Sequence, residues 1–113
     1  MKNSQRIPMR KLSMEMKQIT KKYLTSQIRQ KLSQADRPGS SPEEEQRKIS
    51  YQSYIDAFDL ALSALEPTHR MIIHNDYIHL TFAFWWEQKY SRSTYYRHKY
   101  EALIQFLSLF ANL

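Results

Sequence analysis

One helix is predicted from residues 90–106, which read YSRSTYYRHKYEALIQF. Ser91 suits the N-cap, because its hydroxyl can accept a hydrogen bond from a backbone amide left unpaired at the start of the helix. Side chains suited to packing then recur at spacings of three and four, which gives the helix one largely apolar face. They are Tyr95, His98, Ala102, Phe106 and Phe110. We therefore expect the back of this helix to be anchored in the core.

The front of the same helix is cationic, hydroxyl-rich and aromatic. Positive charge and hydrogen-bonding groups on the first exposed turns of a helix suit the major groove of duplex DNA. An ordinary solvated face is the alternative interpretation. The predicted DNA contacts are Arg92, Ser93, Tyr96, Arg97 and Lys99.

The composition indicates a small all-α protein. The chain has 113 residues, 42% of them hydrophobic, and a single Gly beside four Pro argues against a turn-rich β architecture. No run approaches the ~18 apolar residues of a membrane span, and the N-terminus lacks the apolar segment of a secretory signal. The absence of cysteine excludes disulfides and thiolate metal sites. We expect a cytoplasmic protein that has no membrane partner.

Charge divides the chain into three blocks. Residues 1–33 carry nine basic residues against one acidic, residues 34–67 carry three against seven, and residues 68–113 carry five against three. The net charge of +6 favours polyanionic partners. The blocks indicate a basic amphipathic helical arm over 1–33, a linker over 34–41 where the only glycine follows a proline, and a helical domain over 42–113.

A long basic helix is predicted from about Met9 to Leu32, with a narrow apolar stripe. Such a helix is marginal alone in water, so the stripe needs a partner surface. Docking on its own domain, contact with nucleic acid and contact with an acidic protein all stay open. The basic residues expected to make secondary phosphate or partner contacts are Lys11, Lys17, Lys21, Lys22 and Arg29.

A second helix is predicted to start at Ser41. Ser41 can cap it, Pro42 suits the first helical position, and Glu44 completes a capping box. The apolar pattern continues to about Leu65, and Glu66-Pro67 ends this helix and opens the next.

The remaining segments carry strong apolar signals. We expect a short helix around Ile72 and Ile73 that ends at Asn75-Asp76, and an aromatic segment over 80–87 that belongs to the core or to an interface. Within that segment Trp85 and Trp86 are interpreted as core residues, one of them reaching the surface. The C-terminal residues 103–113 are apolar nearly all round, so they are either wrapped in the core or in contact with another chain.

The sequence offers no catalytic site. Because Gly39 is the only glycine, both a nucleophile elbow and a phosphate-cradling loop are excluded. Three histidines, His69, His74 and His79, are five residues apart and would fan out around an α-helix, and His98 is interpreted as a packing residue. We therefore expect no enzyme activity, metal, cofactor or small-molecule substrate.

Residues 51–110 resemble the region 4 helix-turn-helix of bacterial sigma factors, and more closely the sigma-like regulators of phages. The resemblance rests on the string Leu-Ser-Ala-Leu-Glu-Pro-Thr-His-Arg-Met-Ile-Ile from Leu62 and on Ser-Arg-Ser-Thr-Tyr-Tyr-Arg from Ser91. In that family a recognition helix begins with Ser or Thr and carries an Ala-Leu pair eleven residues on, as Ala102-Leu103 do here. Gln88-Lys89-Tyr90 would form the turn of a helix-turn-helix over about 67–110.

The resemblance implies a sigma-like transcription factor that associates with the nucleoid, contacts promoter DNA and has RNA polymerase subunits as partners. The alternative is a helical adaptor that binds RNA polymerase or another protein without reading DNA sequence.

Overall fold

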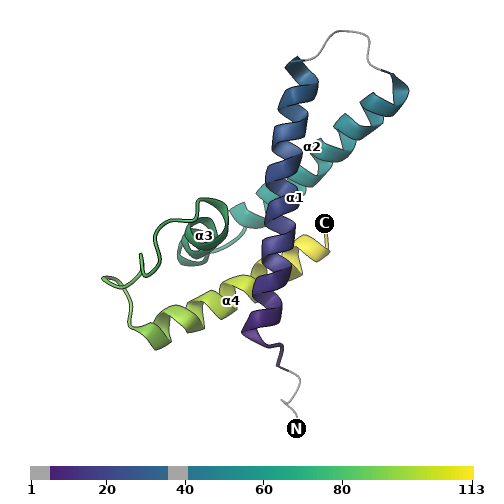
Figure 1. Ribbon diagram of the computed structural model, residues 1–113. Coiled ribbons are helices and arrows are strands. Elements are labelled where there is room, and N and C mark those ends of the chain that lie inside the picture. The colour runs from purple at the N-terminus through teal and green to yellow at the C-terminus, as the bar shows by residue number, and fades with distance from the viewer. Residues whose placement is uncertain (1–5, 36–40) are drawn as a thin grey trace.

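The computed structural model describes residues 6–35 and 41–113, and within them it contains helices and no strand. The helices are α1 (Met9–Ala35), α2 (Pro42–Ser63), α3 (Pro67–Ile73), the π-helix η2 (His74–Ile78) and α4 (Arg92–Ala111), as Figure 1 shows. The prediction of an all-α fold is confirmed. Most of the predicted linker, residues 36–40, lies outside the described residues.

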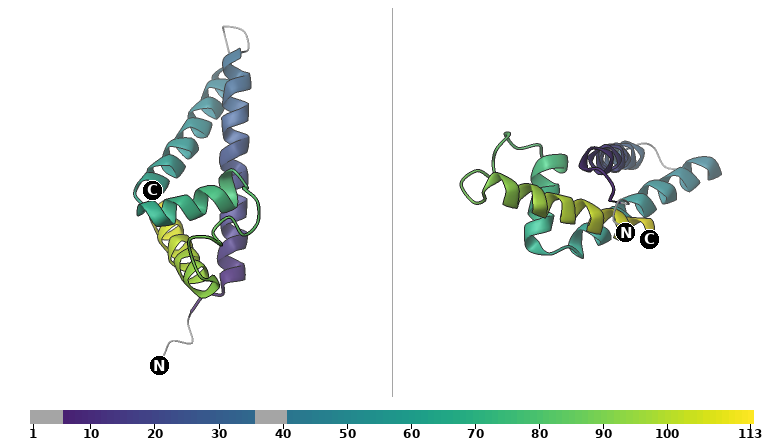
Figure 2. Two further views of the ribbon diagram at one scale, coloured as in Figure 1. Left: turned by 90° about the vertical axis from the view of Figure 1, so that its left-hand side faces the viewer. Right: turned by 90° about the horizontal axis from the view of Figure 1, so that it is seen from below.

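The core is built where α4 packs against α1 and α2 (Figure 2). Tyr23 of α1 stacks on Phe58 of α2 at a centroid distance of 3.8 Å, and Phe58 lies 5.0 Å from Phe106 of α4. Buried residues of α1 also include Leu12 and Met16. The N-terminal helix is therefore not a detached arm. Its apolar stripe docks on the protein's own domain, which is one of the three alternatives that the sequence left open.

The predicted starts of α2 and α4 are confirmed in atomic detail. The Glu44 amide donates to Ser41 Oγ at 3.2 Å, and the Ser41 amide donates to Glu44 Oε1 at 2.8 Å, which completes the capping box. At α4 the Thr94 amide donates to Ser91 Oγ at 3.2 Å. Each hydroxyl thereby satisfies a backbone donor that has no partner inside its helix.

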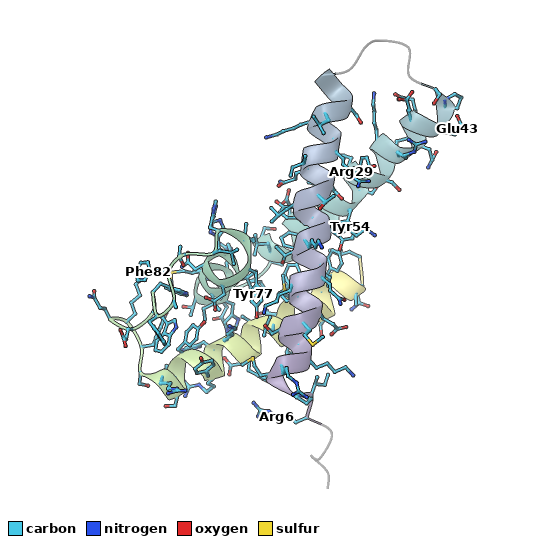
Figure 3. All side chains as sticks on the ribbon, in the orientation of Figure 1. Arg6, Arg29, Glu43, Tyr54, Tyr77 and Phe82 are labelled. Atoms are coloured by element: carbon cyan, nitrogen blue, oxygen red, sulfur yellow. The ribbon has the colours of Figure 1, made fainter. Side chains whose placement is uncertain are left out.

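The outer parts of α1 and α2 project beyond the core. The radius of gyration is 16.9 Å, whereas a compact domain of this length has about 13 Å. Figure 3 places Arg29 and Glu43 on these projecting parts, away from Tyr77. Large apolar side chains are exposed there, namely Ile28, Leu32 and Ile49.

Two predictions about residues 70–91 are corrected. The helix around Ile72 does not end at Asn75-Asp76 but continues as η2 to Ile78. The tight turn expected at Gln88–Tyr90 is replaced by residues 79–91, which form bends and turns, whereas a helix-turn-helix has a turn of about three or four residues. The helix-turn-helix is therefore not confirmed.

Backbone conformation explains why no helix forms across residues 80–87. Leu80 and Phe84 have φ values of 48° and 66°, in the left-handed region that interrupts a right-handed helix. The segment is held instead by Trp86, whose ring stacks on Tyr95 of α4 at 4.3 Å. Trp86 is buried and Trp85 is half-buried, so the tryptophans do belong to the core, whereas Phe82 and Phe84 are exposed.

The C-terminal segment packs one face into the core, whereas its end is exposed, with Leu113 at 59%. Leu103 and Phe106 are fully buried, and Phe110 stacks on Phe106 at 5.8 Å. Within the described part of the chain, no helix is long and apolar enough to span a membrane.

Candidate nucleic-acid interface

The front of α4 presents four of the five predicted DNA contacts on its exposed first turns. Arg92, Ser93, Tyr96 and Arg97 are all exposed, while Tyr95 between them is buried, as the helical phase requires. The exposed fraction of Tyr96 is 41%, enough for one face of its ring to contact a ligand. Two guanidinium groups, a hydroxyl and an aromatic ring therefore share one surface.

The structure adds Arg6 to this surface. Its guanidinium carbon lies 3.9 Å from the ring centroid of Tyr100, whose hydroxyl donates to the carbonyl oxygen of Ile7 at 2.8 Å. These contacts hold the segment before α1 beside α4, where the segment forms one wall of a groove of about 570 Å³. The groove is lined by Arg6, Ile7, Pro8, Met9, Ser93, Tyr96, Arg97 and Tyr100. Sequence reasoning missed Arg6, because no local spacing connects it to α4.

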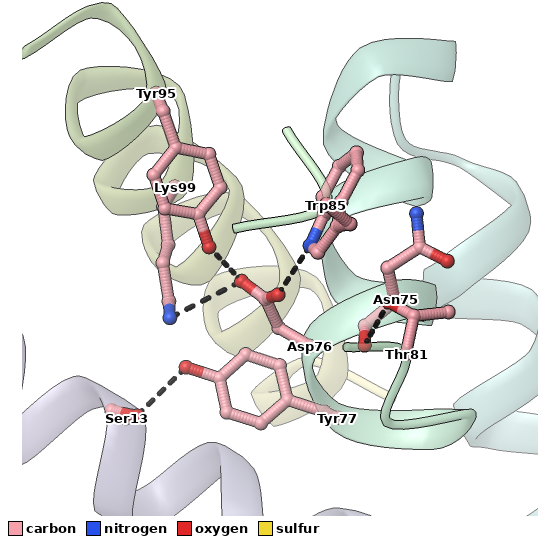
Figure 4. Close-up of polar contacts among 8 residues, drawn as sticks. All are labelled: Ser13, Asn75, Asp76, Tyr77, Thr81, Trp85, Tyr95 and Lys99. Atoms are coloured by element: carbon pink, nitrogen blue, oxygen red, sulfur yellow. Dashed lines mark hydrogen bonds and ion pairs between the residues drawn. The ribbon is translucent and has the colours of Figure 1, made fainter. Parts of the chain in front are cut away.

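Lys99 does not belong to the exposed surface. Its Nζ lies 3.2 Å from Asp76 Oδ2, and the exposed fractions of the two side chains are 17% and 14% (Figure 4). The same ammonium lies 5.3 Å from the ring centroid of Tyr77 and 5.8 Å from that of Tyr95. The charge of Lys99 is therefore directed into the structure, and we remove it from the candidate interface.

Asp76 is the polar centre behind the interface. It accepts hydrogen bonds from Trp85 Nε1 at 2.7 Å and from the Tyr95 hydroxyl, in addition to its ion pair with Lys99 (Figure 4). Burial and the neighbouring Asp76 carboxylate both raise the pKa of Tyr95, so its hydroxyl stays protonated and donates. One carboxylate thus fixes η2 and the aromatic segment against the back of α4.

The neighbouring residue ties this centre to α1. Tyr77 is buried, and its hydroxyl lies 2.7 Å from Ser13 Oγ (Figure 4). Burial raises the pKa of Tyr77, although hydrogen bonding to Ser13 and the charge of Lys99 oppose that shift. The rear of α4 is consequently held through η2 to the long N-terminal helix.

The predicted secondary contacts occupy other surfaces. Lys21, Lys22 and Arg29 line a groove of about 940 Å³ between α1 and α2, together with Arg47 and Tyr54. The Lys22 ammonium lies 4.7 Å from the Tyr54 ring centroid, a cation–π contact. Lys17 and Lys21 border a different groove, beside Tyr77 and Leu80. The remaining member, Lys11, is exposed near the start of α1.

The histidines lie differently from the prediction. The rings of His74 and His79 are 4.2 Å apart, because the π-helix joins the His79 amide to the His74 carbonyl and brings residues five apart together. Burial, and then the charge of His79, lower the pKa of His74. His98 is half-buried on α4, as expected for a packing residue. Among the described residues, one group can offer three metal ligands, namely His69, His98 and Glu101.

Comparison with known proteins gives no relative: no protein-family model, no curated protein and no solved structure matches this chain.

Proposed function

We propose that this protein binds duplex DNA through the first turns of α4. The observation that carries the proposal is the groove that Arg6 and Arg97 line with Ser93 and Tyr96. Arg92 is exposed on the same first turns of α4 and lines a neighbouring pocket that shares Tyr96. Arginine can pair with phosphate oxygens or with guanine edges, and Ser and Tyr hydroxyls can bond the backbone. The packed rear of α4 supplies the rigid support that such a helix needs.

The biological role that we propose is that of a sigma-like transcription factor which associates with promoter DNA and RNA polymerase on the nucleoid. Its support is the sequence resemblance at residues 62–73 and 91–103. Since residues 79–91 are longer than a helix-turn-helix turn, we assign the DNA contact to α4 itself and to Arg6, not to the helix-turn-helix motif as a whole.

The test measures DNA affinity by fluorescence anisotropy over a range of salt concentrations. Changing Arg92 and Arg97 together to Ala removes two cationic contacts, so the slope of log affinity against log salt should fall by about 2. The matched control changes Lys31 and Lys48 to Ala, which removes the same charge from the outer parts of α1 and α2, away from the groove that Lys21, Lys22 and Arg29 line. An equal loss in both variants, or no loss in the first, contradicts the proposal.

A second candidate function is protein binding by the segment between η2 and α4. Leu80, Phe82 and Phe84 have exposed fractions of 72%, 76% and 60%, and two of them occupy the unfavourable left-handed conformation. Exposed apolar side chains held at backbone strain are typical of contact surfaces. This observation favours the adaptor, which would bind RNA polymerase without reading DNA.

The two functions are separated by binding purified RNA polymerase to the immobilised protein, with and without nuclease. Retention after nuclease that is lost when Phe82 and Phe84 are changed to Ser favours the adaptor. Retention that depends on DNA and on Arg92 and Arg97 favours the DNA-binding function.

A further inference from the structure

Three side chains with metal-binding chemistry converge where α3 meets α4. His69 comes from α3, and His98 and Glu101 come from one face of α4, because residues three apart on a helix are neighbours. Glu101 Oε1 lies 3.5 Å from His69 Nε2 and 3.7 Å from His98 Nδ1. The three potential ligand atoms, one from each side chain, all lie within 4.8 Å of one another.

A hydrogen bond on the far side of the His69 ring fixes which of its two nitrogens faces Glu101. His69 Nδ1 lies 2.9 Å from Gln105 Oε1, an oxygen that can only accept a hydrogen bond. Nδ1 therefore donates to Gln105, which leaves Nε2 as the ring nitrogen that faces Glu101. Histidine ligands of metals are commonly oriented in this way, by a partner on the other ring nitrogen.

His98 provides independent evidence for a bound ion at this cluster. Its Nδ1 is buried and has no hydrogen-bond partner in the described part of the chain. The 3.7 Å separation from Glu101 is too long for a hydrogen bond. Two imidazole nitrogens and a carboxylate thus face one another, an arrangement that a positive charge between them would stabilise.

The spacing suits a tetrahedral metal ion. Zinc with ligands at about 2.0–2.1 Å requires the ligand atoms to lie about 3.3 Å apart. The two distances to Glu101 Oε1, 3.5 and 3.7 Å, are close to this value, and the two histidine nitrogens, which lie within 4.8 Å of each other, would approach as the ion binds. His69 is buried while Glu101 is half-exposed, which leaves a side open for entry of the ion and for a water as fourth ligand. Imidazole and carboxylate together are ligands that Zn²⁺ accepts.

We propose that His69, His98 and Glu101 bind one Zn²⁺ ion, which joins α3 to α4. Even together, α3 and η2 span only residues 67–78, a length at which a helix is marginal alone in water, and the ion would fix α3 to the helix that carries the candidate DNA-binding surface. The competing occupant is a proton on one imidazole, which would form an ion pair with Glu101.

The experiment titrates the untagged, metal-free full chain with ZnCl₂ by calorimetry and with CoCl₂ by visible absorption. We expect one ion per chain and the d–d bands of four-coordinate Co²⁺. His98→Ala and Glu101→Ala should each weaken the affinity at least about tenfold, and Gln105→Ala about tenfold, because it removes the partner that orients His69. Neither His98 nor Glu101 is fully buried, so we expect both alanine variants to fold. Circular dichroism verifies that each variant is folded.

The matched control changes the other close histidine pair, His74 and His79, to Ala, and Zn²⁺ affinity should be unchanged. Absence of stoichiometric Zn²⁺ binding overturns the proposal. Wild-type affinity in His98→Ala, or loss of binding in the His74/His79 control, overturns it as well. DNA affinity is measured separately, so failure of the metal site leaves the proposed function standing.

Discussion

Asp76 shows how a single residue organises the aromatic half of this protein. Its carboxylate receives the Trp85 indole, the Tyr95 hydroxyl and the Lys99 ammonium, three groups from two different segments. A half-buried carboxylate is stabilised by such donors, and each donor is fixed in return. Without Asp76, the Lys99 charge would be left in an apolar, aromatic environment.

The consequence is measurable in stability. Asp76→Ala should lower the free energy of unfolding by about 3 kcal/mol, because it leaves a poorly exposed ammonium without its counter-charge. Asp56→Ala serves as the control, since Asp56 is exposed and accepts from Gln52 of the same helix, and should change stability by less than about 0.5 kcal/mol. Urea unfolding followed by circular dichroism gives both values; similar losses would refute the role assigned to Asp76.

At the scale of elements, α4 combines a buried back with an exposed cationic front. Its back is set by Tyr95, Ala102 and Phe106, which lie in the core, while its start is set by the Ser91 cap. The cap is also extended by the Ser91 hydroxyl, which donates to Thr94 Oγ1 at 2.9 Å. The position of the first turn, and therefore of Arg92, depends on these contacts.

Removal of the Ser91 cap should lower stability more than removal of a serine hydroxyl that caps no helix. Ser91→Ala should cost about 1 kcal/mol of unfolding free energy, because the Thr94 amide loses its acceptor. Ser93→Ala, an identical change two residues on at an exposed helical position, should have little effect or stabilise slightly. Chemical denaturation compares the two variants, and equal costs would argue against the capping role.

The whole molecule has two regions of different packing density. Around the crossing of α1, α2 and α4 the helices share an aromatic core, whereas the outer parts of α1 and α2 project with Ile28, Leu32 and Ile49 exposed. Helices with one partner and few buried side chains open more readily than those inside a core.

Hydrogen exchange should therefore divide each long helix. We expect amides of residues 28–33 and 45–51 to exchange about tenfold faster or more than those of residues 12–26 and 55–62, which line the core. Each helix supplies its own control, since both parts share the same backbone hydrogen-bonding pattern. Uniform protection along α1 would show that the projecting parts are as stable as the core.

Local signals in the sequence determined where α2, α3 and α4 begin. The Ser41–Glu44 box, the Glu66-Pro67 boundary and the Ser91 cap all involve residues within four positions of one another, so their geometry follows from short-range chemistry. The apolar periodicity likewise identified Tyr95 as buried and Tyr96 as exposed.

The tertiary structure alone decided the contacts between residues that lie far apart in the sequence. The Asp76–Lys99 pair withdraws a predicted DNA contact, the Arg6–Tyr100 contact adds another cation, and His69 meets His98 across two helices. No spacing rule connects these positions, because each pairing arises from how α3, η2 and the segment before α1 pack against α4. The sequence by itself determined where the four α-helices begin and which of their faces are apolar, because these depend on neighbouring residues. Packing determined which charges remain at the surface.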